Sequence, residues 1–339
     1  MYQLDQEAPE VFLLISLKDS VKPKFISRDR FEALGRAAST VEALIRFETL
    51  FSIVVEAALD FERYIVNLCL DYVYEFNSLV SNDYRATSNG SNIRLLTFLT
   101  AVRAYQDQRR RHLQPPHVPQ EVEQQASDVY RAMFDNSYEY RVMEALRNYS
   151  QHQNLPLDGI GLHILTEGPD RKPTEDGPRR HRVSVSPFFE VAVILREGDR
   201  IRQATRREME DRGEKRLDMR YYLRAYLSDL VCCHCEVREI TEVFINEAGS
   251  MLSQAEYHFF NQSSLPIDST KGPFLAKAIE DRTERYAYVG SGHARELIGV
   301  RKKWSNLKGL RFVYVSSQLS SGPPLDLSHG DNRSVWVPK

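Results

Sequence analysis

The strongest constraint on the fold is a run of about fifty residues, 27–76, in which apolar side chains recur every three or four positions. Ser27, followed by Asp29 and Glu32, is a suitable N-cap and first turn for a helix. The pattern predicts one long bent helix or two consecutive helices. The repeating positions are Leu34, Val41, Leu44, Ile45, Leu50, Ile53, Val54, Ala57, Phe61, Ile65, Leu68, Tyr72 and Phe76.

Two further helices are expected in the first half of the chain, at about residues 93–110 and 121–154, with a proline-rich break between them. Pro156 ends the second helix, because the residue before a proline avoids the helical conformation. Residues 11–17 are expected to form a short strand or a docked arm. The first predicted domain, residues 1–155, is therefore an all-helical bundle with an N-terminal arm.

The second half of the chain, residues 156–339, is expected to form a smaller α+β region. Residues 161–166 and 182–195 are rich in strand-forming side chains and flank a turn-rich segment, which predicts a β-hairpin. Helical character returns from about 201 to 260, and residues 310–316 have a strand-like pattern. The predicted fold class is α+β and mainly α.

Charge and composition indicate a globular chain without a strong electrostatic field. The sequence has 45 Lys and Arg against 47 Asp and Glu, so a polyanion would have to be bound by local clusters. No apolar run approaches the ~20 residues of a membrane span. The first residues lack a basic segment followed by an apolar one, so a cytoplasmic protein with no membrane contact is expected.

Residues 147–152, at the end of the predicted helix 121–154, carry the most informative side chains: Arg147, Asn148, Tyr149, Ser150, Gln151 and His152. An imidazole titrates near neutral pH and can act as a general base or acid. A guanidinium stays protonated and can stabilise a phosphorane with two hydrogen bonds. Asparagine and glutamine can orient either group. These residues suit RNA cleavage by 2′-hydroxyl attack, which needs no metal or other cofactor.

Arg147 is followed directly by the polar residue Asn148, and four residues separate Arg147 from His152. This pattern resembles the signature of the HEPN superfamily. The resemblance covers about residues 28–155 and implies metal-independent endoribonucleases of toxin–antitoxin, phage-defence and RNA-processing systems. It implies that Arg147 and His152 are the catalytic pair, that Asn148 supports them, and that the active site is composite in a homodimer. Asn154 stands where one subfamily has a Tyr that is modified with a nucleotide, so that regulation is not expected.

RNA is the expected partner, together with a second copy of the chain and a possible antitoxin or regulatory protein. Tyr149 could stack on a base and Gln151 could contact RNA beside the motif. A compact basic run, Arg109, Arg110 and Arg111, could contact phosphates.

Two alternatives remain open at this point. The helical bundle could bind RNA or a protein without cutting, as a non-catalytic HEPN-like module. The cluster of Cys232, Cys233, His234 and Cys235 could bind zinc, but it lacks the second, distant pair of ligands that structural zinc sites use. For His234, a buried and hydrogen-bonded side chain is therefore the preferred prediction.

Overall fold

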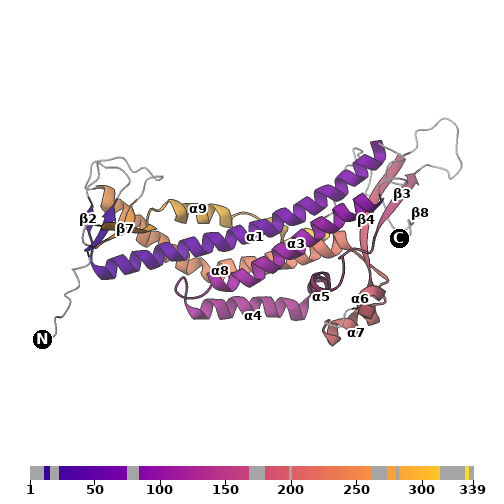
Figure 1. Ribbon diagram of the computed structural model, residues 1–339, viewed down its shortest axis with the longest axis horizontal. Helices are drawn as coiled ribbons and strands as arrows, with labels where there is room; N and C mark the ends of the chain where they lie inside the picture. The colour runs from indigo at the N-terminus through magenta and orange to yellow at the C-terminus, as the bar shows by residue number, and fades with distance from the viewer. Residues whose placement is uncertain are drawn as a thin grey trace. The chain divides into compact units, whose positions relative to one another are not determined.

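A computed structural model of the 339-residue chain describes residues 11–15, 23–74, 84–167, 180–197, 201–261, 273–279, 282–313 and 333–335 (Figure 1). Most of these residues are helical, and two small antiparallel sheets complete the fold, which confirms the predicted class of α+β and mainly α. Within these residues, no helix combines the length and the apolar character needed to cross a bilayer. The helices are α1 (Arg28–Tyr74), α3 (Tyr84–His112), α4 (Gln120–Asn136), α5 (Tyr138–His152), α6 (Val191–Glu197), α7 (Gln203–Arg212), α8 (Met219–Asn261), α9 (Gly292–Arg301) and the 3₁₀ helix η1 (Ser305–Phe312).

The chain divides into two compact units, each assembled from three segments. Unit 1 consists of residues 1–52, 104–131 and 232–305, and unit 2 consists of residues 53–103, 132–231 and 306–339. The cuts fall inside α1, α3, α4, α8 and η1. Each unit thus takes residues from both sides of position 155, where the sequence analysis divides the chain. The division of the chain into regions 1–155 and 156–339 stays a prediction.

The long apolar repeat forms one continuous helix, α1, which is the first of the two predicted arrangements. Leu34, Val41 and Leu44 are buried in unit 1. Phe61 and Leu68 are buried in unit 2. The repeat extends the helix because each turn adds another apolar side chain to the same face.

The sheet of unit 1 has the order β2 (Lys24–Phe25), β1 (Val11–Ile15), β6 (Phe274–Ile279) and β7 (Arg282–Tyr288). It confirms a strand within residues 11–17, whereas β6 and β7 were not predicted. The Lys24 ammonium donates to the carbonyls of His258 and Phe259 at 2.9 and 2.7 Å. These bonds attach the sheet to the last turn of α8 and satisfy carbonyls that a helix end leaves without partners (Figure 1).

The sheet of unit 2 has the order β5 (Arg216–Asp218), β4 (Arg180–Glu190), β3 (Gly159–Glu167) and β8 (Arg333–Val335). Strands β3 and β4 form the predicted hairpin, with Leu162 opposite Val185. The second strand was expected to reach residue 195, but α6 begins at Val191.

The predicted strand at residues 310–316 is wrong for its first part, which lies in η1; residues 314–316 are outside the described residues. Side chains of α8 bind this segment. Ser228 donates to the Lys308 carbonyl, and Arg224 donates to the Val313 carbonyl at 2.8 Å. These bonds attach η1 and Val313 to α8.

The single helix predicted over residues 121–154 is also wrong, because Ser137 divides it into α4 and α5. Ser137 is extended, with φ −109° and ψ 118°, and its hydroxyl accepts from the Tyr140 amide at 3.2 Å. The same hydroxyl donates to Asp229 of α8 at 2.6 Å. Ser137 thus caps α5 and attaches its first turn to α8.

Replacing Ser137 with alanine is expected to lower the free energy of unfolding by about 1–2 kcal/mol, because the α5 cap is lost. Denaturant unfolding monitored by circular dichroism measures the change. Ser253→Ala is the matched control, since Ser253 is exposed inside α8. Equal stability of Ser137→Ala and Ser253→Ala would contradict the capping role.

Candidate active site

The candidate site is the C-terminal half of α5, in unit 2. The apolar face of this helix is buried as expected and includes Val142 and Leu146. The helix ends at His152, and the Gln153 amide donates to the Tyr149 carbonyl at 2.9 Å. The predicted end of the helix before Pro156 is therefore correct to within two residues.

Arg147 lies on the buried side of α5, although a charged side chain is expected on the polar side of an amphipathic helix. Its side chain is only 5% exposed, and its Nη2 lies 2.7 Å from the Glu144 carboxylate, one turn earlier. Nη2 also lies 3.5 Å from the Asn148 side-chain oxygen, at the limit of a hydrogen bond. The guanidinium is thus a buried cation that is paired on its own helix.

His152 is the exposed end of the motif. Gln151 is exposed as well, and Asn148 is half-buried. An imidazole and an amide are therefore accessible at the end of α5, and a buried cation lies five residues before the imidazole.

Tyr149 does not offer a stacking face. It is buried, and its ring packs edge-on against Phe189, with centroids 5.4 Å apart. Since that contact occupies the ring, the structure argues against base stacking by Tyr149. Gln151 remains accessible for RNA contact.

The basic run Arg109, Arg110 and Arg111 lies in the last turn of α3, in unit 1. Arg109 is buried, and its guanidinium lies 3.9 Å from the ring centre of Tyr130. Arg110 and Arg111 are exposed, and Arg110 lies 3.6 Å from Glu123. Of the three, Arg110 and Arg111 are the side chains that could reach a phosphate.

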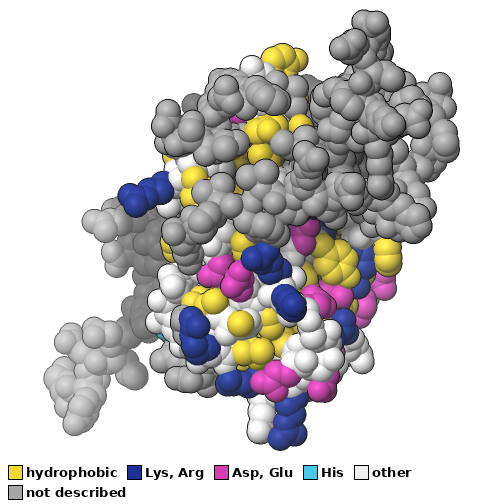
Figure 2. Space-filling model, turned by 90° about the vertical axis from the view of Figure 1, so that its right-hand side faces the viewer, with side chains coloured by type: hydrophobic (Ala, Val, Ile, Leu, Met, Phe, Trp, Pro, Cys, Tyr) yellow, Lys and Arg dark blue, Asp and Glu magenta, His cyan; other side chains and the backbone are white. Residues whose placement is uncertain are grey.

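Figure 2 shows the end of the molecule at which Figure 1 draws β3, β4, α6 and α7. On the described part of this face, Lys and Arg side chains are interspersed with Asp and Glu side chains. Phosphate binding there would depend on individual side chains and not on one basic patch.

Sequence reasoning missed Glu144 and Tyr226 as neighbours of the motif. The Tyr226 hydroxyl, from α8, donates to Glu144 Oε1. The position of Glu144, three residues before Arg147, is a visible signal for an ion pair on a helix. The pairing of α8 with α5 depends on tertiary packing and has no local signal. Three acidic residues of α1 contact other cations: Glu48 contacts Arg238, Asp60 contacts Arg94 and Glu62 contacts Arg224.

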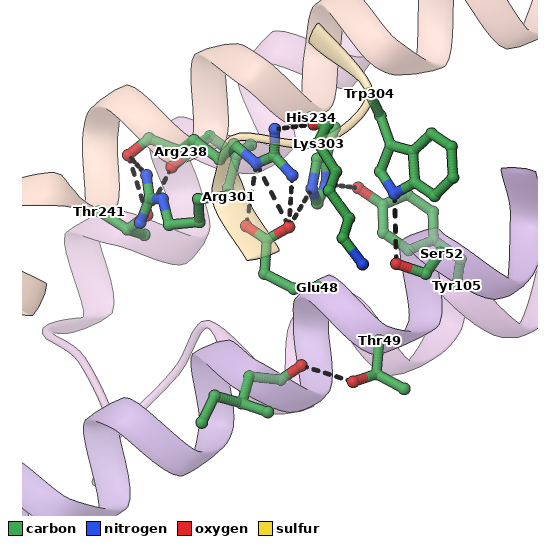
Figure 3. A network of polar contacts seen from close by, with 12 residues as sticks. Glu48, Thr49, Ser52, Tyr105, His234, Arg238, Thr241, Arg301, Lys303 and Trp304 are labelled. Atoms are coloured by element: carbon green, nitrogen blue, oxygen red, sulfur yellow. Dashed lines mark hydrogen bonds and ion pairs between the residues drawn. The ribbon is translucent and has the colours of Figure 1, made fainter. Parts of the chain in front are cut away.

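A second polar cluster, in unit 1, surrounds His234 (Figure 3). Its Nε2 lies 3.0 Å from Glu48 and its Nδ1 lies 2.9 Å from the Tyr105 hydroxyl. The imidazole stacks on Phe51 with centroids 3.9 Å apart. The prediction of a buried, hydrogen-bonded histidine is confirmed. Among the described residues, no three Cys, His, Asp or Glu side chains are arranged to hold a metal ion.

Glu48 is the centre of this cluster. It accepts two hydrogen bonds from Arg238, from Nη2 at 2.6 Å and from Nε at 3.0 Å. Burial would raise the pKa of Glu48, but the hydrogen bonds from His234 and Arg238 lower it to about 2. Burial lowers the pKa of His234, against the opposite effect of Glu48. An ionised carboxylate only accepts, so Nε2 carries the proton of a neutral His234 and Tyr105 donates to Nδ1.

Searches against family models, curated proteins and solved structures found no match for this chain.

The neutral state of His234 predicts acid lability. The unfolded histidine takes up a proton near pH 6.5, while the folded one resists protonation, so the unfolded state binds more protons below that pH. The free energy of unfolding should therefore rise with pH towards about 6.5. Denaturant titrations between pH 5 and 7 should show a smaller slope against pH in His234→Gln. An identical slope in both proteins would show that folding does not change the pKa of His234.

Proposed function

We propose that this protein is a HEPN-like, metal-independent endoribonuclease that acts as a toxin or an anti-phage effector. Arg147 and His152 are the proposed catalytic pair, and Asn148 is the supporting polar residue. The main support for the proposal comes from the end of α5, where His152 is exposed and Arg147 is a buried cation paired with Glu144. A cytoplasmic location would place such an enzyme with its RNA substrate.

Each group matches one demand of RNA cleavage. The 2′-hydroxyl must lose a proton as it attacks phosphorus, and the leaving 5′-oxygen must gain one; His152 can carry either proton. The phosphorane gains negative charge, which the positive charge of Arg147 can stabilise. Burial strengthens that interaction, because the effective dielectric constant near a buried group is lower than in water. The products would carry a 2′,3′-cyclic phosphate and a 5′-hydroxyl.

The proposed enzyme acts as a homodimer. The attacking and leaving oxygens lie on opposite sides of the phosphorus atom in an in-line reaction, so one imidazole cannot serve both. A second His152 from another copy across a two-fold axis would supply the other proton transfer. An antitoxin or regulatory protein could act by covering this composite site.

A second candidate function is a non-catalytic module that binds RNA or a protein. The burial of Arg147 against Glu144 favours it, because a paired, buried cation can serve α5 alone. In that case the exposed polar end of α5 would contact the partner, and no covalent bond of the RNA would change.

Incubation of the purified protein with total RNA separates these functions. Wild type should cleave RNA in the presence of EDTA, and His152→Ala should lower the rate by about 100-fold or more. Because His152 is exposed, its replacement should leave the unfolding curve unchanged. The matched control is His258→Ala, another exposed histidine in the last turn of a helix.

Undiminished cleavage by His152→Ala would exclude His152 as the proton-transferring group. Loss of cleavage in EDTA would contradict a metal-independent reaction. Binding of RNA by wild type without cleavage, weakened in Arg147→Ala, would establish the binding module.

A further inference from the structure

Arg147 is held from two helices, and not only by its neighbours on α5. Glu144 uses its two carboxylate oxygens separately. Oε2 lies 2.7 Å from Arg147 Nη2, and Oε1 accepts from the Tyr226 hydroxyl of α8. The guanidinium is thereby attached to α8 through a chain of three side chains in unit 2.

The far end of this chain is rigid. Tyr226 is fully buried, and its ring packs edge-on against Phe98 and Tyr140, with centroids 6.1 and 4.9 Å away. Burial, and then the Glu144 carboxylate, raise the pKa of Tyr226, so the phenol keeps the proton that it donates. The packed ring fixes the position of the hydroxyl, and the hydroxyl fixes the carboxylate.

This arrangement is not what stability alone would favour. Replacing a buried ion pair by apolar side chains is often neutral or stabilising, because each charge loses its hydration. The apolar face of α5 already anchors the helix through Val142 and Leu146, which are fully buried. A charged side chain kept at this position suggests a demand other than packing.

We propose that Glu144 and Tyr226 are positioning residues for Arg147 in the reaction proposed above, on which this inference rests. An arginine side chain has many rotamers, and ordering it during the reaction would cost free energy. Glu144 and Tyr226 order the guanidinium before RNA binds, so its charge is in place when the phosphorane forms. They act through Arg147 and do not touch the RNA.

Two conservative substitutions test this positioning role. Glu144→Gln keeps the size of the side chain and removes its charge, and Tyr226→Phe removes only a hydroxyl. Each should lower kcat by about 10- to 100-fold, the scale on which misplacement of a catalytic group reduces rate. KM should change by less than kcat. Glu144→Gln should retain more activity than Glu144→Ala, because the amide oxygen still accepts.

Tyr222→Phe is the matched control. Tyr222 lies one turn earlier on α8, is buried, and donates to Glu214 at 2.6 Å. Its replacement removes the same kind of Tyr–Glu hydrogen bond without touching the chain to Arg147. Tyr222→Phe should therefore retain the wild-type kcat. Unfolding curves of all variants identify any that fail to fold. If Glu144→Gln does not fold, Tyr226→Phe still tests the proposal.

The outcomes separate the two proposals. Cleavage by wild type that His152→Ala abolishes, with lower kcat in Glu144→Gln and Tyr226→Phe alone, supports both. If His152→Ala abolishes cleavage but Glu144→Gln and Tyr226→Phe keep the wild-type kcat, the positioning role is overturned. The proposal of a nuclease then still stands. An equal loss in Tyr222→Phe also overturns it, because general packing would then explain the effect. Absence of cleavage by wild type overturns both proposals.

Discussion

The burial of the Arg147 guanidinium is the constraint on which the candidate site depends. A cation at 5% exposure must have a nearby anion, because an isolated buried charge costs far more than a domain can tolerate. Glu144 supplies the anion from one turn earlier, and Tyr226 satisfies the second oxygen of that carboxylate. The position of Arg147 therefore depends on α8 as well as on α5, although only α5 carries the motif.

Both units place a carboxylate between an arginine and a neutral donor, yet the two clusters differ in what they offer chemically. Glu48 in unit 1 binds Arg238 and His234, and all three side chains are buried. A substrate cannot reach them unless that region unfolds, so this cluster links α1 to α8 within unit 1 and offers no accessible group for chemistry. In unit 2, an exposed imidazole follows the buried pair on the same helix. That difference is the reason for assigning chemistry to α5.

The sequence was informative where structure is local and uninformative where it is not. The apolar repeat predicted α1, and alternating strand formers predicted the β3–β4 hairpin, because periodicity reports one buried face. The break at Ser137 has a local signal, a cap residue before Glu139, which the continuous apolar pattern concealed. The pairing of β1 with β6 and the Tyr226–Glu144 contact join positions far apart in the chain, and periodicity does not report such pairings.

The burial of Arg147 bears on how RNA would bind. A helical wheel places Arg147 and His152 about 140° apart, so an α-helix cannot aim both at one atom by geometry alone. A phosphate at this site would meet the exposed imidazole of His152, whereas the guanidinium of Arg147 is buried. Water screens the charge of a buried group less than that of an exposed one. In the proposed reaction, a cation that is already ordered would be more useful than a mobile one, since no reorganisation is then needed when negative charge develops.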